Sequence, residues 1–337
     1  MIRVGIVGAT GYGGRELLRL LGGHPEAELT AAASTSVAGK PLADEMPAFG
    51  KLINLSFETF DAKSLAERCD VVFLGVPGTD SMAPGAALRA AGAKVIDMGP
   101  DFRLHDTAAF ETYYKTAHTQ PDLLPEAVYG LVPWNRDALT DASLVAVPGC
   151  YPAGAILPLK PLLSAAKPTV PIVIDSVSGI SGAGRSLKQG FHFPEMNENV
   201  WAYKVGQHQH TPEIEQALDH AVQVQFTPHV GPYTRGILST ITVRPEAAFD
   251  VGACYACYDA EPFVRVLGEG TLPDLAAVRG SNFCDIAWVN DERTGNLILV
   301  SAIDNLVGGT AGMALQCMNL MFGLDETTGL TAGGMTV

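Results

Sequence analysis

The chain opens on Ile2-Arg3-Val4-Gly5-Ile6-Val7-Gly8-Ala9-Thr10-Gly11-Tyr12-Gly13-Gly14. The mostly apolar residues before Gly8 predict a buried strand, and an amphipathic pattern through Leu21 predicts a helix. Gly8, Gly11 and Gly14 therefore occupy the turn between a strand and a helix. Such a turn lets the backbone approach a pyrophosphate, which the N-terminus of the helix then binds. A tight turn without a ligand is the alternative, and the strand and helix on either side favour the nucleotide.

Strands and helices continue to alternate through the first half of the chain. A strand over 28–33 completes the first strand–helix–strand unit, and apolar strands follow over 70–76 and 94–98 with a helix over 79–91 between them. This alternation predicts an α/β fold with a Rossmann-type, doubly wound parallel sheet. Residues 105–142 are polar and aromatic, and we expect them to form an excursion on the surface.

The end of the strand over 28–33 should meet the adenosine ribose of a dinucleotide. NAD-specific sites usually have Asp or Glu there, whereas this chain continues with Ser34-Thr35-Ser36-Val37-Ala38-Gly39-Lys40. Hydroxyls and a lysine suit a 2′-phosphate, so the sequence favours NADP. A loop with a solvated lysine is the alternative and leaves the cofactor open. The expected cofactor contacts in this half are Gly8, Thr10, Gly11, Tyr12, Gly13, Gly14, Ser34, Ser36 and Lys40.

A second junction of strand and helix lies at Val147-Pro148-Gly149-Cys150-Tyr151-Pro152. An apolar run over 144–147 predicts a short buried strand, and residues 151–163 have helical spacing. Cys150 then stands at the start of a helix, where unpaired N–H groups and the helix dipole favour a thiolate. Free cysteines are also commonly buried for packing alone. The position of Cys150 by itself therefore leaves both roles open, that of a nucleophile and that of a structural residue.

Beyond Cys150 the strands are no longer separated by a helix in every case. Strand-like runs cover 170–177, 223–230, 236–244, 281–289 and 296–303. Helices are predicted over 250–267 and 308–322. This pattern predicts a second α/β domain with a mixed sheet. We place the domains at 1–149, completed by the C-terminal segment 308–337, and at 150–307.

Three polar stretches have residue types suited to chemistry. Arg103 follows the strand over 94–98 and suits bidentate binding of a substrate phosphate, or else a salt bridge to Asp101. The glycine-rich stretch Ser178-Gly179-Ile180-Ser181-Gly182-Ala183-Gly184-Arg185 permits close approach of a ligand or unusual backbone angles.

The third polar stretch is His208-Gln209-His210-Thr211-Pro212, just before a predicted helix. Thr211 suits its N-cap and Pro212 its first helical position. Of the two histidines we expect one to be structural and one to transfer protons.

Composition and charge disfavour several classes of function. The net charge of −14 over 337 residues disfavours nucleic acid and anionic membranes as partners. No apolar run reaches the ~18–20 residues of a membrane span, and the N-terminus has no signal-peptide pattern. The six cysteines are too sparse for a disulfide scaffold, and the Cys254–Cys257 pair has no companion ligands for a metal. We expect a cytoplasmic enzyme without a metal.

Together these features describe the thiol-mediated reduction of an activated acyl group. A thiolate attacks the acyl carbon and expels the leaving group, which gives a thioester. Hydride from a nicotinamide reduces the thioester to a thiohemiacetal, which collapses to an aldehyde. A histidine accepts the thiol proton and later returns one. If Cys150 were structural, a plain carbonyl dehydrogenase would fit equally well.

Over essentially its whole length the chain resembles the N-acetyl-gamma-glutamyl-phosphate reductases of arginine biosynthesis, relatives of aspartate-semialdehyde dehydrogenase. The specific part of the likeness is the Pro-Gly-Cys-Tyr-Pro and His-x-His-x-Pro-Glu-Ile pair. The motifs that carry it are Gly8-Ala9-Thr10-Gly11-Tyr12-Gly13-Gly14, Asp101-Phe102-Arg103-Leu104, Val147-Pro148-Gly149-Cys150-Tyr151-Pro152, Ser178-Gly179-Ile180-Ser181-Gly182-Ala183-Gly184-Arg185, His208-Gln209-His210-Thr211-Pro212-Glu213-Ile214, Phe226-Thr227-Pro228-His229, Arg235-Gly236-Ile237-Leu238 and Asn319-Leu320-Met321-Phe322-Gly323.

The resemblance implies NADPH-dependent reduction of N-acetyl-gamma-glutamyl phosphate, a small-molecule acyl phosphate, to the semialdehyde and phosphate. It implies Cys150 as nucleophile and His208 and His210 as the acid/base pair. We favour His210 because it directly precedes the helix. It also implies a homodimer or homotetramer. The further contacts expected are Arg103, Arg185 and Ser181 for the substrate and Gly182 and Asn305 for the cofactor.

The chain departs from the family pattern at Val76-Pro77-Gly78, Gln209 and Gly308, where His, Arg and Lys are common. These departures concern contacts to cofactor and acyl chain, so two relatives stay open as alternatives. One is an aspartate-semialdehyde dehydrogenase, against which the His-Gln-His-Thr-Pro-Glu-Ile stretch speaks. The other reduces a carrier-bound aminoadipyl phosphate, against which the acidic charge speaks. An NADP-sensing protein without catalysis is the alternative outside enzymes.

Overall fold

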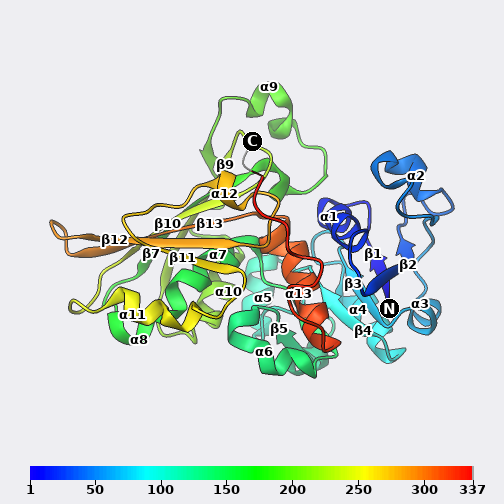
Figure 1. Cartoon of the computed structure of the whole chain (residues 1–337), viewed down its shortest axis with the longest axis horizontal. Coiled ribbons are helices and arrows are strands. Elements are labelled where there is room, and N and C mark those ends of the chain that lie inside the picture. Colours follow the sequence, from blue (N-terminus) through cyan, green and yellow to red (C-terminus); the bar gives the residue numbers. More distant parts are fainter. Residues whose placement is uncertain (336–337) are drawn as a thin grey trace. The chain divides into compact units, whose positions relative to one another are not determined.

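The structure is a computed structural model that describes residues 1–335. It divides into two compact units (Figure 1). The first comprises residues 1–148 and 310–331, and among the described residues the second comprises 149–309 and 332–335. No helix among the described residues is long and apolar enough to cross a membrane.

The first unit is built on a six-stranded sheet in the order β2-β1-β3-β4-β6-β5, and every pair of neighbours is parallel. Its strands are β1 Ile2–Val7, β2 Ala27–Ala33, β3 Val71–Leu74, β4 Lys94–Asp97, β5 Ala127–Tyr129 and β6 Leu144–Ala146. Its helices are α1 Tyr12–Leu21, α2 Leu42–Glu45, α3 Ala62–Arg68, α4 Met82–Ala90, α5 Thr107–Tyr114, α6 Val132–Thr140 and α13 Gly312–Met321.

The interior strand β3 reads Val-Val-Phe-Leu, and all four side chains are fully buried. A run of this kind is what a parallel strand covered on both faces requires. The chain runs outward from β1 to β2 and crosses back to β3 on the other side. In open α/β sheets ligands bind at such a reversal of strand order, beyond the carboxyl ends of the strands. The predicted doubly wound sheet is confirmed, with the glycine turn at this point.

The second unit is built on a seven-stranded mixed sheet in the order β11-β12-β13-β10-β7-β9-β8. Its strands are β7 Ile172–Gly179, β8 Trp201–Ala202, β9 Val224–Gly231, β10 Ile237–Val243, β11 Val264–Glu269, β12 Cys284–Asp291 and β13 Asn296–Ile303. Its helices are α7 Cys150–Leu159, α8 Leu163–Ala166, α9 Phe193–Met196, α10 His210–Ala217, α11 Val251–Tyr255 and α12 Leu275–Val278. The predicted mixed sheet is confirmed.

The predicted helix over 250–267 is wrong beyond its first turns. Helix α11 ends at Tyr255, a 3₁₀ turn covers Ala256–Tyr258, and the chain then becomes strand β11. Strand β11 pairs in parallel with β12 and shifts register between Val266 and Gly268. Pairing to a strand twenty residues downstream decides this segment, because Val264 and Val266 fit a sheet as well as a helix.

Two further segments differ from expectation. Residues 105–142 are more than a surface excursion, because they supply α5, α6 and the edge strand β5, and Phe110 on α5 is fully buried. The predicted last helix over 308–322 begins with a π-turn, Val307–Ala311, and becomes α-helical only at Gly312.

The end of the chain also departs from the predicted domain limits. Residues 308 and 309 belong to the second unit, and so do residues 332–335. The N–H of Met335 donates to the carbonyl of Arg279 at 2.7 Å, and Arg279 Nη2 donates to the carbonyl of Met335 at 3.1 Å. These bonds hold the tail beside α12, so the segment predicted to complete the first domain does so only over 310–331. Residues 336 and 337 lie outside the described residues.

Candidate active site

The glycine turn of the first unit is shaped by close backbone approaches. Gly8 has φ +87°, and a Cβ there would lie 2.5 Å from the carbonyl oxygen of Gly75. A Cβ on Gly14 would lie 2.6 Å from the carbonyl oxygen of Gly8. Helix α1 starts after Gly11, without a side-chain cap and without an acidic residue in its first turn. Its uncapped N–H groups and positive dipole end fit the pyrophosphate of a dinucleotide.

The residues expected to select the 2′-phosphate lie just beyond β2. The hydroxyls of Ser34 and Ser36 are 3.3 Å apart, so the structure brings these two residues together. Lys40 Nζ forms an ion pair with Glu45 Oε1 at 2.7 Å. A 2′-phosphate that recruits Lys40 must therefore compete with a neighbouring carboxylate, whereas the two hydroxyls need no rearrangement of charge. Tyr12 is about one-third exposed on the same turn.

Arg103 is buried in the first unit, and its guanidinium is engaged by the backbone. Its Nε donates to the carbonyl of Val147 at 2.8 Å and its Nη2 to that of Met98 at 3.0 Å. Asp101 accepts a hydrogen bond from the Ser81 hydroxyl at 2.7 Å, and the same hydroxyl lies 3.0 Å from Asp97 Oδ2. Arg103 thus ties the loop after β4 to the end of the segment that leads to Cys150.

Asp97 is fully buried, and this desolvation raises its pKa from 3.8 to about 7. The folded protein therefore binds the Asp97 proton more tightly than the unfolded chain does. The contribution of this group to the free energy of unfolding is fully present below about pH 4 and is lost as the pH rises through about 7. We expect the wild-type protein to lose on the order of 3 to 4 kcal/mol of unfolding free energy between these two pH values, and Asp97→Asn not to show this loss. Asparagine keeps an acceptor for the N–H of Gly99.

The measurement is urea unfolding of both proteins at about pH 5 and about pH 8. Wild type should lose stability relative to Asp97→Asn on going to the higher pH. An equal pH dependence in the two proteins would show that Asp97 ionises as freely in the fold as in the unfolded chain.

Cys150 is the first residue of α7, as predicted. The preceding Gly149 is the N-cap, with φ −65° and ψ 151°, and no side-chain oxygen caps the helix. The cysteine is partly exposed. The π-turn packs directly against it, because a Cβ on Gly309 would lie 2.8 Å from Cys150 Cβ. Only a glycine lets the chain pass this close to the thiol-bearing residue without displacing it.

Glu213 fixes the residue before the thiol. It lies on α10, is fully buried, and its Oε1 accepts the N–H of Gly149 at 2.8 Å. Helices α7 and α10 pack against each other. One carboxylate therefore joins the turn that carries Cys150 to the helix that begins at His210. The sequence signal for Glu213 is a carboxylate one helical turn after His210.

His208 and His210 stand together at the start of α10, with ring centroids 4.7 Å apart. The Nδ1 of His208 accepts the N–H of His210 at 3.1 Å. Helix α10 begins at His210 with Gln209 as N-cap, whereas the predicted N-cap was Thr211. The His208 side chain thus binds the backbone N–H of the first helical residue. Burial, aided by the charge of Lys204, lowers the pKa of His208 to about 3. His208 is therefore neutral near pH 7.

Two tyrosines connect the histidines to the cysteine. The ring of Tyr151, the neighbour of Cys150, lies 5.7 Å from that of His208 and 5.8 Å from that of His210. Its hydroxyl donates to the carbonyl of His229 at 3.0 Å and accepts from the Tyr203 hydroxyl at 3.2 Å. Burial raises the pKa of Tyr203 to about 12. Burial also raises the pKa of Tyr151, so both tyrosines stay protonated near pH 7 while their rings contact those of the histidines.

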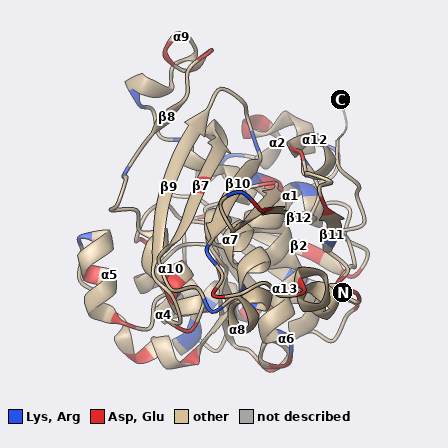
Figure 2. Cartoon of the chain, turned by 90° about the vertical axis from the view of Figure 1, so that its left-hand side faces the viewer, with Lys and Arg blue, Asp and Glu red and all other residues tan. Residues whose placement is uncertain are grey.

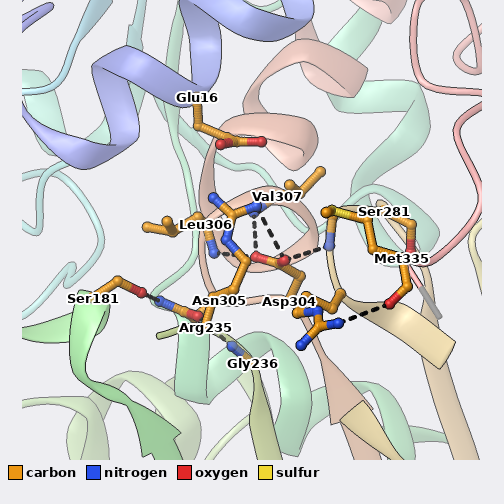
Figure 3. A network of polar contacts seen from close by, with 12 residues as sticks. Glu16, Ser181, Arg235, Gly236, Ser281, Asp304, Asn305, Leu306, Val307 and Met335 are labelled. Atoms are coloured by element: carbon orange, nitrogen blue, oxygen red, sulfur yellow. Dashed lines mark hydrogen bonds and ion pairs between the residues drawn. The ribbon is translucent and has the colours of Figure 1, made fainter. Parts of the chain in front are cut away.

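The segment after β13 is held by a buried polar network (Figure 3). Asp304 is fully buried and accepts N–H groups from Gly280, Leu306 and Val307 at 2.6 to 3.1 Å. Arg235 Nη1 lies 3.4 Å from its Oδ2. Because the N–H of Gly309 donates to the carbonyl of Asp304 at 2.8 Å, the network sets the path of the π-turn beside Cys150.

Asn305 and Ser181, both predicted from the sequence, meet in the same network. Asn305 Nδ2 donates to the Ser181 hydroxyl at 2.9 Å, and its Oδ1 accepts the N–H of Gly236 at 2.7 Å. Gly182 lies beside this contact, since a Cβ there would be 3.8 Å from Asn305 Nδ2. Arg185 follows Gly184 on an exposed part of the same loop. The structure thus groups Ser181, Gly182 and Asn305 and places Arg185 at the surface.

No group of three or more His, Cys, Asp or Glu side chains among residues 1–335 is arranged to hold a metal ion. The Cys254–Cys257 pair lies on α11 and the following 3₁₀ turn, and both thiols are free.

Comparison with known proteins agrees on a family. Residues 3–142 match the NAD binding domain of semialdehyde dehydrogenase, and residues 150–305 match its dimerisation domain. The chain is 49% identical to N-acetyl-gamma-glutamyl-phosphate reductase of Desulforudis audaxviator, with 99% of each chain covered. It is 48% identical to the protein of that name from Symbiobacterium thermophilum, over 99% of this chain and 98% of the other.

Solved structures share the fold at low identity. Aspartate semialdehyde dehydrogenase II of Vibrio cholerae, complexed with ASA, has a TM-score of 0.74 and 16% identity, over 96% of this chain and 98% of that one. The aspartate semialdehyde dehydrogenase of Candida albicans, determined with NADP, has a TM-score of 0.72 and 17% identity over the same shares.

Proposed function

The chain belongs to the N-acetyl-gamma-glutamyl-phosphate reductase family, and on this premise we propose that it reduces N-acetyl-gamma-glutamyl phosphate to N-acetylglutamate 5-semialdehyde and phosphate. The observation that carries the proposal is Cys150 at the uncapped start of α7, tied through Gly149 and Glu213 to the helix that begins at His210. A plain carbonyl dehydrogenase has no use for a cysteine held in this way. NADPH is the reductant.

The residues act in a fixed order. Cys150 gives its thiol proton to His210 and attacks the acyl carbon, and the bond from that carbon to the phosphate oxygen breaks. The product is a thioester on Cys150 and free phosphate. NADPH, when bound, supplies the hydride that converts the thioester to a thiohemiacetal. The carbon–sulfur bond then breaks, the aldehyde leaves, and a proton from His210 restores the thiol.

The remaining site residues bind and orient. The turn with Gly8, Thr10, Gly11, Tyr12, Gly13 and Gly14 holds the pyrophosphate, and Ser34, Ser36 and Lys40 hold the 2′-phosphate. Asn305 and Gly182 complete the cofactor contacts, while Ser181 and Arg185 contact the substrate. Arg103 supports the substrate site through Val147, whose carbonyl it binds three residues before Cys150. His208, which is neutral near pH 7, orients His210 by accepting a hydrogen bond from the backbone N–H of His210.

The discriminating experiment is the reverse reaction, followed as phosphate-dependent reduction of NADP. N-acetylglutamate semialdehyde should support turnover and aspartate semialdehyde should not. Preference for aspartate semialdehyde would instead support the second candidate function, that of an aspartate-semialdehyde dehydrogenase. Solved structures of such enzymes share the fold of this chain. NADP binding without turnover of either aldehyde would favour a sensing protein.

For the cofactor we expect at least about a tenfold preference in kcat/KM for NADP over NAD, which is roughly 1.4 kcal/mol of differential binding. The physical reason is the pair of hydroxyls on Ser34 and Ser36, with Lys40 as a cation within the same turn. Replacing both serines by alanine should reduce the preference mainly by raising KM for NADP. Equal kcat/KM for the two cofactors in wild type would contradict this assignment.

The dimerisation domain over 150–305 suggests assembly from copies of this chain, which we propose as a homodimer or homotetramer. None of the six cysteines, all within the described residues, forms a disulfide, and we place the enzyme in the cytoplasm. Analytical ultracentrifugation tests the first point, and a monomer at micromolar concentration would refute it.

A further inference from the structure

Two buried carboxylic acids of the first unit are bridged by one hydroxyl. The acidic residues on α5 and α9 lie at the surface (Figure 2), whereas Asp97, at the end of β4, and Asp101, in the loop after it, are fully buried. The hydroxyl oxygen of Ser81 lies 3.0 Å from Asp97 Oδ2 and 2.7 Å from Asp101 Oδ2. None of these three residues has a part in the proposed mechanism.

The bridge requires one proton more than the hydroxyl carries. A serine hydroxyl donates a single hydrogen bond, and an ionised carboxylate can only accept. With both acids ionised, the Ser81 hydroxyl could therefore bind one carboxylate, and the other would face an oxygen lone pair. If one acid is protonated, it donates to Ser81 and Ser81 donates to the other acid, so that both contacts have a donor, as buried polar groups require.

The surroundings of the two acids assign this proton to Asp97. Asp101 Oδ2 accepts the backbone N–H groups of Ser81 and Met82 at 2.8 and 3.0 Å, at the N-terminus of α4, where a negative charge is favoured. Asp101 Oδ1 has no hydrogen-bond partner among residues 1–335, so a proton there would have no acceptor. Asp97 Oδ1 accepts the N–H of Gly99 at 2.9 Å, which leaves Oδ2 to donate to Ser81. The burial that raises the pKa of Asp97 acts in the same direction.

The charged and titratable groups that face this pair of acids are Arg103 and His118. The charge of Arg103 lowers the pKa of Asp97 but does not outweigh burial. His118 Nε2 lies 2.8 Å from the backbone carbonyl oxygen of Asp101. Loss of the shared proton would leave two anions bridged by one hydroxyl in a buried site, where like charges repel strongly. The chain has little room to adjust in place, because a Cβ on Gly99 would lie 2.9 Å from Asp97 Oδ1.

The residue after Asp97 contacts the glycine turn. A Cβ on Gly75 would lie 2.9 Å from Met98 Cε, and a Cβ on Gly13, at the start of α1, would lie 3.8 Å from the same atom. The carbonyl of Met98 accepts from Arg103 Nη2 at 3.0 Å, which joins the two ends of the loop after β4. A movement of this loop away from the acids would therefore also move the Met98 side chain at the glycine turn.

We propose that one proton shared by Asp97, Ser81 and Asp101 holds the loop over 98–104 against the glycine turn, and that loss of this proton weakens binding of the dinucleotide. When the proton leaves, repulsion between the carboxylates displaces the loop, and Met98 loses its contact with the turn. Asp97 is thus a positioning residue that must be neutral, and alkaline pH favours release of the cofactor. This inference rests on the proposed function for the place of the cofactor at the glycine turn.

The first test is calorimetric titration of NADP into wild type and Asp97→Asn at about pH 6 and about pH 8.5, on either side of the Asp97 transition. Asparagine reproduces the protonated acid, since its amide can donate to Ser81 and its oxygen can accept from Gly99. From the lower to the higher pH, Kd should rise about threefold or more in wild type relative to the variant. Titration of the cofactor affects both proteins equally, and Asp122→Asn, at an exposed position, should match wild type. An equal pH dependence of Kd in wild type and Asp97→Asn would overturn the coupling.

The second test detects the proton itself and needs no cofactor. Infrared spectroscopy separates the carbonyl band of a protonated carboxylic acid from the bands of carboxylates, and exposed carboxylic acids are ionised at about pH 6. Wild type should show this band at about pH 6 and lose it by about pH 8.5, and Asp97→Asn should lack it. Asp101→Asn should keep the band but lose it at a lower pH, because the neighbouring negative charge is gone.

Absence of the band from wild type, or its presence in Asp97→Asn, would refute the shared proton. If Asp97→Asn does not fold, the band of wild type and its earlier loss in Asp101→Asn decide the question. Failure of the proposed function gives a different result. A wild-type protein that shows the band but binds no NADP would refute the cofactor and with it the coupling, whereas the shared proton would stand.

Discussion

Cys150→Ser should lower kcat of the reductase by at least about 10³-fold while leaving the fold and NADP binding intact. A serine hydroxyl is a poor nucleophile near pH 7 without a strong base, and its ester is a worse hydride acceptor than a thioester. The change is nearly isosteric, and Cys150 is only partly buried at the start of α7. The loss therefore reports on chemistry and not on packing.

Rapid quench on wild type should also reveal release of one phosphate per site before NADPH is consumed, since thioester formation precedes reduction. Cys150→Ser should lack this burst. The matched control is Cys254→Ser, which changes a free thiol on α11 and should keep wild-type kcat. A Cys150→Ser protein with near-normal kcat would exclude the thioester route and leave direct reduction of a carbonyl.

Selective labelling gives an independent check. Burial raises the pKa of the thiols of Cys69, Cys254, Cys257, Cys284 and Cys317. Near pH 7 those thiols are protonated and react slowly with iodoacetamide. One equivalent of reagent should therefore modify Cys150 first and abolish activity in proportion. Labelling that leaves activity intact would point away from Cys150.

The sequence predicts best where local signals act alone. Strands β1 and β13 begin and end where the apolar runs begin and end, and α7 starts at Cys150 because Pro148 and Gly149 break the strand before it. In each case the chain signals its own boundary through glycine, proline or a change of hydrophobic period. The candidate nucleophile Cys150 and the glycine turn could be predicted for the same reason.

Prediction fails where a distant partner decides the structure. Residues 264–267 join a strand because β12 offers them a pairing edge, which a helical reading of 250–267 cannot detect. Glu213 becomes a support for Cys150 through the N–H of Gly149, 64 residues away. The π-turn beside the thiol depends on Asp304, whose partners include Gly280 and Arg235. Such residues acquire their roles only when the mixed sheet has formed.

The second large effect is expected for His210→Asn, which should lower kcat/KM about 10²- to 10⁴-fold, the usual range for loss of a general base. His210 must be neutral to accept the proton of Cys150, so wild-type kcat/KM should fall as the pH is lowered and His210 becomes charged. We call this fall in kcat/KM at low pH the acid limb. The variant should lose the acid limb along with most of its activity. The measurement is kcat/KM from about pH 5 to about pH 9 in the direction of acyl phosphate reduction.

His208→Asn is the matched control because it changes the adjacent ring. The pKa of His208 is about 3, so this group stays neutral across the measured range and cannot produce the limb. Asparagine can still accept the N–H of His210, although it loses the ring contacts with Tyr151 and Tyr203. We therefore expect a smaller loss in kcat and an acid limb that persists. If His208→Asn removes the fall in activity at low pH and His210→Asn keeps it, the roles of the two histidines are reversed, and the base is the ring that accepts the backbone N–H of His210.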